Sequence, residues 1–304
     1  MKRPRVLAVG LSCIDHLWRV DRFPPVMSRT RASMYRVQGG GPAATGAVTV
    51  SILGGDAELW AVHGEDANGS YLASELEEFG VGIKGVIQPE GAVTLVSGIL
   101  TAPDGERHIF CFHGSGLVDQ ERKSGLNKVA SFGAVLVDNT YPKMTQAALI
   151  AARQAGVPSI ADFGNCANWH LAKLVDTLVV SEECAEEILG RNDPEDAIGK
   201  LRQFPEQVVG ITLGEHGYLY DSGQGICRVD AFSINAVDTN GAGDVFHGAY
   251  AYGIANKWDH DRCGLFASAT AALACTALGG RAGIPNHADV VRLLREEGKD
   301  EQGL

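Results

Sequence analysis

Two hydrophobic patterns alternate along this chain. Short runs rich in Val, Ile and Leu have no polar side, which is typical of strands covered on both faces of a sheet. Between them, apolar residues spaced three to four apart predict helices with one buried face. The predicted strands span 6–9, 57–62, 134–137, 159–162, 177–180 and 207–212, and the predicted helices span 42–53, 69–78, 145–155, 182–189 and 195–204. This order predicts an α/β domain with a mostly parallel sheet covered by helices on both faces.

Two segments, about 16–36 and 91–114, interrupt this alternation. In the second, the stretches 94–100 and 106–112 flank Pro103, Asp104 and Gly105, which are typical of a hairpin turn. Each segment predicts part of a small separate sheet, whose apolar face needs a bound ligand or a second subunit to cover it. We therefore expect one domain over residues 1–304, with a small β-sheet lid formed by these two segments and a homodimer formed through the lid. The last third of the chain is helical in pattern, over 241–255, 260–278 and 287–297.

Composition narrows the class of partner. The net charge of −11 and the pI near 5.3 argue against nucleic acid or an anionic membrane surface, because both would on balance repel the protein. The seven cysteines include no CxxC pair, which argues against a disulfide framework or a zinc site. No stretch approaches the roughly 18 apolar residues of a membrane span, and the N-terminal apolar run is too short for a signal peptide. We therefore expect a cytoplasmic protein that binds a small molecule.

The segment DTNGAGD, residues 238–244, carries the strongest chemical signal. Gly241, Ala242 and Gly243 stand at the start of a predicted helix, where backbone N–H groups have no helical partner and the helix dipole favours an anion. Such amides can stabilise the charge that grows during phosphoryl transfer. Asp244 follows directly, and a carboxylate beside a phosphate site is suited to accept the proton of an attacking hydroxyl. The alternative is an ordinary acidic residue in a first helical turn, worth roughly 0.3 to 1 kcal/mol.

A second glycine cluster, Gly39, Gly40 and Gly41, also precedes a predicted helix. It can be written as the G-x-G-x-x-A of a dinucleotide-binding turn. That fingerprint should follow the first buried strand of a sheet, whereas here it follows the polar stretch 34–38 and contains Pro42. Close approach of the backbone to a substrate is the interpretation that the sequence favours.

Two further positions have weaker signals. The segment GEDANG, residues 64–69, predicts a turn and a helix cap with a structural role. Asp15 comes six residues after the first predicted strand, near the edge of the sheet where open α/β folds bind ligands, although a surface turn explains it equally well.

Together these motifs resemble the PfkB, or ribokinase-like, carbohydrate kinases over nearly the whole chain. DTNGAGD is the most specific element, and GGGPAAT (39–45), GEDANG and the two-part lid follow in the family's order. The resemblance implies a ribokinase-like three-layer sandwich, with Asp244 as catalytic base and Gly241, Ala242 and Gly243 as phosphate-binding amides.

The resemblance also assigns roles outside that turn. It implies Asp15 and Gly40, within the Gly39–Gly41 turn, at the sugar hydroxyls. It places ATP along a groove with Mg2+, and Arg107 of the lid over the transferred phosphate, unless Arg107 is only a solvated strand residue. The positions expected along the nucleotide are Thr212, Gly214, Gly217, Asn240, Gly241, Gly243 and Cys275.

The chain departs from the family at several positions. Thr45 stands where ribokinase-like members have an asparagine, and Ser181 to Cys184 replace the family's Asn-x-x-Glu motif. Magnesium would then be held mainly by ATP and water, with Glu182 and Glu183 as the candidate helpers, and no protein ligand is assigned to it. GGGPAAT, GAGDVFHGA and GGRAGIP are most similar to bacterial sulfofructose kinases. That subgroup is expected to bind the sulfonate through a lysine, an asparagine and an arginine, where this chain has Arg29, Cys111 and Thr140. Because a buried sulfonate without partners is strongly disfavoured, sulfofructose is not the predicted substrate.

The sequence therefore predicts an ATP-dependent kinase that phosphorylates a primary hydroxyl of a ketohexose or related sugar. Two alternatives remain. One is a nucleoside kinase, for which Trp18, Phe23, Phe110 and Phe112 could supply an aromatic base pocket. The other is a non-catalytic sugar or nucleotide sensor, against which the intact Asp244 and glycine turn argue.

Overall fold

The computed structural model describes residues 3–24, 29–102, 107–191 and 193–299. Its main sheet has eight strands in the order β12-β11-β10-β9-β8-β7-β1-β4. All neighbouring strands are parallel except at one edge, where β11 and β12 are each antiparallel to the preceding strand. The strands are β1 (Arg5–Val9), β4 (Asp56–Trp60), β7 (Ala134–Asp138), β8 (Ser159–Asp162), β9 (Thr177–Ser181), β10 (Val208–Thr212), β11 (Tyr218–Asp221) and β12 (Ile226–Val229). The six predicted buried strands are confirmed, and the β11–β12 hairpin was not predicted.

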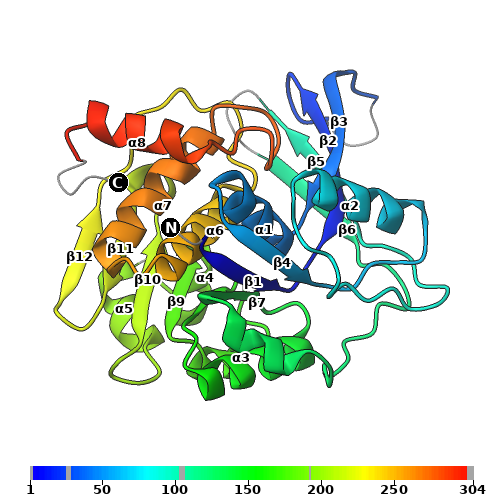
Figure 1. Cartoon of the computed structure of the whole chain (residues 1–304). Helices are drawn as coiled ribbons and strands as arrows, with labels where there is room; N and C mark the ends of the chain where they lie inside the picture. Colours follow the sequence, from blue (N-terminus) through cyan, green and yellow to red (C-terminus); the bar gives the residue numbers. More distant parts are fainter. Residues whose placement is uncertain (1–2, 25–28, 103–106, 192, 300–304) are drawn as a thin grey trace.

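Helices cover both faces of this sheet (Figure 1). One face carries α1 (Pro42–Ile52), α6 (Ala242–Ala255), α7 (His260–Ala274) and α8 (His287–Glu296), and the other carries α3 (Pro142–Ala155), α4 (Glu182–Leu189) and α5 (Pro194–Leu201). The unbroken apolar strands explain this arrangement, because alternate residues enter different cores. In β1, Val6 and Ala8 belong to one core, while Leu7 and Val9 belong to the other.

The predicted helices are confirmed, with two ends corrected. The helix predicted to reach residue 278 ends at Ala274, and the one predicted to reach residue 204 ends at Leu201. At the second end, Arg202 already has an extended backbone conformation, and its guanidinium binds the carbonyl oxygens of Pro205 and Gln207. That side chain therefore stabilises the turn that leads into β10.

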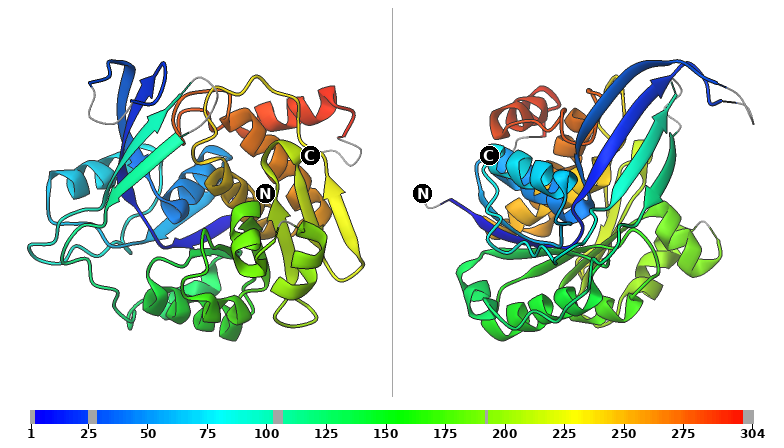
Figure 2. Two further views of the ribbon diagram at one scale, coloured as in Figure 1. Left: turned by 180° about the vertical axis from the view of Figure 1, so that it is seen from behind. Right: turned by 90° about the vertical axis from the view of Figure 1, so that its right-hand side faces the viewer.

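A second, smaller sheet projects from the body, as the right-hand view of Figure 2 shows. Its order is β3-β2-β5-β6, formed by β2 (Cys13–Val20), β3 (Ala32–Gly40), β5 (Val96–Thr101) and β6 (Arg107–Phe112). The remaining helix, α2 (Ala67–Glu78), packs near β2 and β3. The turn predicted at residues 103–105 lies outside the described residues, as do 25–28 of the first interrupting segment. Every residue of β6 is exposed, including Ile109, Phe110 and Phe112.

Helices α1 and α6 lie side by side on the main sheet, and both begin near the small sheet (Figure 1). The contact needs Gly248, because a Cβ there would lie 2.6 Å from the carbonyl oxygen of Gly46. Close packing of the two helices therefore brings both predicted glycine turns, at Gly39–Gly41 and Gly241–Gly243, to the same edge of the sheet. Open α/β sheets bind ligands at this edge.

Candidate active site

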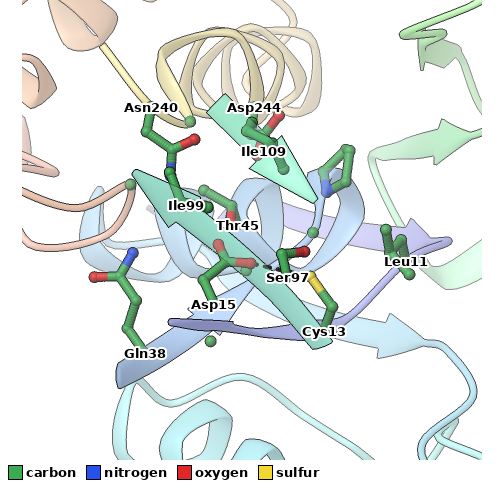
Figure 3. Close-up of a pocket in the computed structure, with 16 residues that line it drawn as sticks. Leu11, Cys13, Asp15, Gln38, Thr45, Ser97, Ile99, Ile109, Asn240 and Asp244 are labelled. Atoms are coloured by element: carbon green, nitrogen blue, oxygen red, sulfur yellow. Dashed lines mark hydrogen bonds between the residues drawn. The ribbon is translucent and has the colours of Figure 1, made fainter. Parts of the chain in front are cut away.

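Two pockets meet at the first turn of α6. The first lies between the small sheet and the starts of α1 and α6, and it is lined by Asp15, Gly39, Gly40, Gly41 and Thr45 among others (Figure 3). The second lies beside β10 and α7. The DTNGAGD residues face the two pockets in turn: Asn240, Gly241 and Asp244 line the first, whereas Thr239, Ala242 and Gly243 line the second. One short turn therefore forms the wall between the two cavities.

Hydrogen bonds to Asp238 stabilise the turn at residues 239–241. Asp238 accepts hydrogen bonds from the amide of Asn240 on one oxygen and from that of Gly279 on the other, both 2.9 Å long. Gly241, the N-cap, has a φ of 74°, and a Cβ there would lie 2.9 Å from Cα of Gly280. Only glycine fits this backbone and this contact without strain.

The amides of Gly243 and Asp244 have no hydrogen-bond acceptor among the described residues. The first helical amide, that of Ala242, donates to the carbonyl of Thr239 at 3.3 Å. No side chain caps this helix. The start of α6 therefore presents free N–H groups where the helix dipole favours an anion. They are those of Gly243 and Asp244, whereas the amide of Ala242, also predicted from the sequence, is bonded to Thr239.

Asp244 has some surface open to the first pocket, and protein atoms surround the rest of the side chain. Burial raises the pKa of Asp244 well above its usual range, and the neighbouring carboxylate of Asp162 raises it further. The charge of His247 lowers the same pKa. Asp244 is thus a carboxylate with a strengthened affinity for a proton, which suits a general base.

His247, one turn further along α6, was not singled out from the sequence. Its Nδ1 lies 2.7 Å from the carbonyl oxygen of Gly243 and 3.1 Å from a carboxylate oxygen of Asp162, and its Nε2 lies 3.1 Å from the carbonyl oxygen of Val179. Because both ring nitrogens face only oxygen acceptors, both must carry protons, so the ring is a cation. The carboxylate of Asp162 and these hydrogen bonds raise the pKa of His247 to about 9 against the opposing effect of burial.

The turn at α1 is supported differently. Asp138, at the end of β7, accepts hydrogen bonds from the amides of Leu11, Ala43 and Thr140 at 2.6, 3.3 and 2.8 Å. These bonds attach α1 and the loop after β1 to the main sheet. Asp138 was not singled out either, because nothing in its local sequence distinguishes it from any aspartate that ends a strand.

A buried ion pair lies under the same turn. Arg281, only 3% exposed, pairs with Glu75 and donates to the carbonyl oxygen of Gly40 at 3.1 Å. Glu75 accepts from the amide of Gly39 at 2.9 Å. A Cβ on Gly39 would overlap both charged groups. The predicted close approach of backbone at Gly39–Gly41 is thus partly an approach to the protein's own side chains.

Asp15 faces this turn from β2 of the small sheet and not from a loop at the end of β1. A Cβ on Gly40 would lie 2.1 Å from Asp15 Oδ2, so the glycine leaves that oxygen accessible. Burial raises the pKa of Asp15, and the Cys13 thiol and Arg281 counteract this rise. Thr45 is 2% exposed, and its hydroxyl lies 3.4 Å from Nε of Arg281.

The second pocket contains most of the predicted nucleotide positions. Its described lining includes Thr212, Gly214, Gly217, Ala242, Gly243 and Cys275, with Tyr218 and Phe246 at its apolar side. A groove of this composition can hold a planar base against apolar side chains, with its anionic end at the free amides of α6.

Arg107, at the start of β6, reaches the same turn. Its Nη1 donates a hydrogen bond to Oγ1 of Thr239 at 3.0 Å. This contact joins the outer strand of the small sheet to the wall between the two pockets, where the resemblance places a lid arginine.

Three predicted substrate positions lie outside the described lining of both pockets: Arg29, Cys111 and Thr140, which are all exposed. The Cys111 thiol nevertheless lies 3.6 Å from the hydroxyl of Ser97, which does line the first pocket. The structure also adds lining residues that the sequence did not indicate: Leu11, Cys13, Gln38, Ser97, Ile99, Ile109 and Gly280.

No cluster of three or more His, Cys, Asp or Glu side chains suited to a metal exists within the part of the chain that the structure describes. Ser181 caps α4 by accepting from the amide of Cys184 at 3.2 Å. Where the described helices are concerned, none is both long and apolar enough to cross a membrane.

Comparisons with known proteins match almost the whole chain. The pattern of the pfkB family carbohydrate kinases matches residues 3–287. An ATP-dependent ribose-1-phosphate kinase of Halopiger xanaduensis is 28% identical over 91% of this chain and 94% of its own length. A nucleoside kinase of Methanothermobacter thermautotrophicus is 25% identical over 94% of each chain. The crystal structure of a proposed ribokinase from Agrobacterium tumefaciens is 30% identical, with a TM-score of 0.93 over 98% of this chain and all of that one.

Proposed function

Because this chain belongs to the pfkB family of carbohydrate kinases, we propose that it transfers the γ-phosphoryl group of ATP to a hydroxyl of a sugar or sugar derivative. The observation that carries this proposal is the shared wall between the two pockets. Asp244 faces the pocket that contains Asp15, and the amides of Gly243 and Asp244 stand beside the groove lined by Thr212 and Cys275. A phosphoryl group crossing from one pocket to the other would pass this turn.

Each group then has a distinct role. Asp15 holds the sugar, and Asp244 accepts the proton of the attacking hydroxyl. The amides of Gly241, Gly243 and Asp244 stabilise the charge that develops on the transferred group. Arg107 adds a positive charge at the same turn, which its contact with Thr239 supports.

Magnesium is proposed to bind together with the nucleotide. Mg2+ in proteins usually keeps several waters and is bound through substrate phosphates with one or two carboxylates. When bound, it would neutralise charge on the phosphates. The triphosphate and water are its main proposed ligands.

The small sheet is the proposed lid and dimer surface. Its outer strand β6 exposes Ile109, Phe110 and Phe112 at 50, 59 and 53%. Ile109 lines the first pocket, whereas Phe110 and Phe112 lie on the opposite face of the strand. Exposed apolar residues on an edge strand favour association with another surface, and a homodimer through this sheet would cover Phe110 and Phe112.

A sugar fits the first pocket better than a nucleoside. A nucleobase needs a flat apolar or aromatic wall, and the described lining contains aliphatic, small and polar residues without an aromatic ring. Phe110 and Phe112, which the sequence offered for such a wall, are instead exposed on β6.

The test is ADP release with ATP and magnesium over a panel of ketoses, aldoses, sugar acids and nucleosides, with Asp244→Asn assayed beside the wild type. We expect a sugar-dependent signal that falls by about a thousandfold or more in Asp244→Asn, while ATP binding and the melting temperature stay unchanged. Near-normal turnover by Asp244→Asn would overturn the assignment of the base. ATP binding by the wild type without ADP from any acceptor would favour the sensor.

A further inference from the structure

Four polar side chains form one row across the small sheet. The register pairs Asp15 of β2 with Gln38 of β3 on one side and with Ser97 of β5 on the other, and it pairs Ser97 with Cys111 of β6. Directly paired residues point to the same face of a sheet, with Cβ atoms roughly 5 Å apart. Gln38, Asp15 and Ser97 all line the first pocket, and Figure 3 shows Gln38 and Ser97 on opposite sides of Asp15.

One half of this row already satisfies its own hydrogen bonds. The Cys111 thiol donates to the Ser97 hydroxyl at 3.6 Å. Burial raises the pKa of Asp15, and the neighbouring Ser97 hydroxyl lowers it. The Cys13 thiol donates to Asp15 Oδ1 at 3.5 Å. The Oδ1 side of Asp15 therefore has partners within the protein.

The other half of the row is incomplete. Gln38 is 6% exposed, and its Nε2 is buried without a hydrogen-bond partner among the described residues. A buried amide without a partner is unfavourable, and native structures contain few of them. The amide of Gln38 packs against Gly279, but no hydrogen bond to any described residue holds it. Because the terminal torsion of a glutamine is broad, its NH2 group can turn toward the pocket.

Asp15 offers a complementary oxygen next to this donor. A Cβ on Gly40 would lie only 2.1 Å from this oxygen, Oδ2, so a larger residue at position 40 would cover it. An unpaired donor and an acceptor that Gly40 leaves uncovered thus stand at directly paired positions of neighbouring strands. The group that satisfies both must accept one hydrogen bond and donate another, which a hydroxyl does and a carbonyl, ether or carboxylate does not.

We propose that Gln38 is a specificity residue, and that Gln38 Nε2 and Asp15 Oδ2 together clamp one hydroxyl of the acceptor sugar. This hydroxyl is not the one phosphorylated, because the attacking hydroxyl gives its proton to Asp244. The clamp selects a neutral polyhydroxy compound at this position, since a carboxylate or phosphate there would meet the charge of Asp15. The proposal rests on the proposed kinase function and deepens it by naming what the acceptor must carry.

The experiment combines enzyme variants with modified sugars. For the panel sugar with the highest kcat/KM, each single-deoxy and deoxyfluoro analogue is assayed with the wild type and with Gln38→Met, which keeps the side-chain length and removes the donor. Gln154→Met makes the same chemical change on the exposed surface of α3 and serves as the control. Gln38→Glu is the second variant, which keeps the shape of Gln38 if the Met variant folds poorly.

In Gln38→Met we expect the KM of the sugar to rise by about tenfold to a hundredfold, with the KM of ATP unchanged and Gln154→Met like the wild type. One deoxy analogue should show the same loss in the wild type and almost no further loss in Gln38→Met. Its fluoro counterpart should not restore binding, because fluorine cannot donate to Asp15. Gln38→Glu should bind the sugar at least as poorly as Gln38→Met.

Two results would overturn the clamp while leaving the kinase intact: an unchanged sugar KM in both Gln38 variants, or equal penalties for every deoxy analogue in wild type and variant. A wild type that releases no ADP with any sugar or sugar derivative of the panel would instead overturn the proposed function, and the clamp with it.

Discussion

Helices α1 and α6 begin alike but differ in what their first amides bind. Each has a glycine N-cap with a positive φ, 94° at Gly41 and 74° at Gly241. Because glycine has no side chain, neither N-cap residue can accept a hydrogen bond from the first amides through a side chain. At α1, however, Pro42 has no N–H, the amide of Ala43 donates to Asp138, and that of Ala44 donates to the carbonyl of Leu11. At the matching positions of α6, the amides of Gly243 and Asp244 find no acceptor within the described residues.

The difference separates two uses of a glycine-rich turn. The turn at α1 is already filled by the protein, so its glycines let Arg281, Glu75 and Asp15 approach the backbone. The turn at α6 keeps amides available for a ligand. The third residue of each helix shows the same contrast, since α1 has the buried Ala44 where α6 has Asp244. Damage to the first turn should therefore appear in stability and sugar binding, and damage to the second in phosphoryl transfer.

The largest effect is expected from the charged support under α1. Glu75→Gln leaves the buried guanidinium of Arg281 without an anion, which should lower the free energy of unfolding by about 3 to 5 kcal/mol. Chemical denaturation measures this loss. The Kd of ATP for the folded variant should be unchanged, because the nucleotide groove lies beyond α6.

The double variant Glu75→Leu, Arg281→Met is the control for this prediction. It removes both charges, so much of the lost stability should return. A single Glu75→Gln variant as stable as the wild type would show that the ion pair does not support the α1 turn.

A smaller effect is expected from exchanging residues at the second position of each helix. A Cβ on Gly243 would meet no protein atom within 4 Å, so Gly243→Ala should fold normally. That methyl group would occupy the space beside a free amide, and we expect kcat/KM for ATP to fall by about tenfold to a hundredfold. Steady-state kinetics and thermal unfolding measure the two effects.

The reciprocal change, Ala43→Gly, should produce the opposite profile. It should cost about 1 kcal/mol of stability and leave kcat/KM for ATP unchanged. Equal loss of ATP-dependent turnover in the two variants would erase the distinction between the turns.

The sequence predicted one of these turns better than the other, for a physical reason. DTNGAGD places the free amides, the proposed base and the helix start within seven residues, so the local pattern alone indicates such a turn. The support of α1 comes from Glu75, Asp138 and Arg281, which are distant in sequence and meet only when the chain folds. No periodicity or spacing could pair them. The predicted position of Asp15 was wrong for the same reason. Asp15 was expected near the end of β1, but after β1 the chain enters the small sheet, where Asp15 lies in β2.

Gln38 and His247 illustrate a second limit of sequence reasoning. A lone polar residue beside a glycine cluster or within an apolar helix has no distinctive pattern. Only the folded structure distinguishes these two residues. The amide nitrogen of Gln38 has no hydrogen-bond partner among the described residues, and the ring nitrogens of His247 both lie next to oxygen atoms.

The smallest expected effect tests what the His247 cation beneath the first turn of α6 contributes. His247 bonds the carbonyl oxygen of Gly243, and its charge lowers the pKa of Asp244. His247→Asn keeps a donor for that carbonyl and removes the charge. The pKa of Asp244 should therefore rise, so the pH below which kcat declines should move up by as much as about one unit. The pH profile of kcat under saturating substrates measures this shift.

Stability should respond in the same variant with a defined sign. The pKa of His247 is raised from 6.5 to about 9 in the folded protein, so its protonation stabilises the fold fully below pH 6.5 and this contribution is lost as pH rises through 9. The stability of His247→Asn should not fall as pH rises through 9. The control is His260→Asn, at the start of α7, in which both the fall of kcat at low pH and the fall of stability at high pH should match the wild type. An unshifted acid limb in His247→Asn would mean that the cation only fills space under the turn, and the contrast between α1 and α6 would then rest on their amides alone.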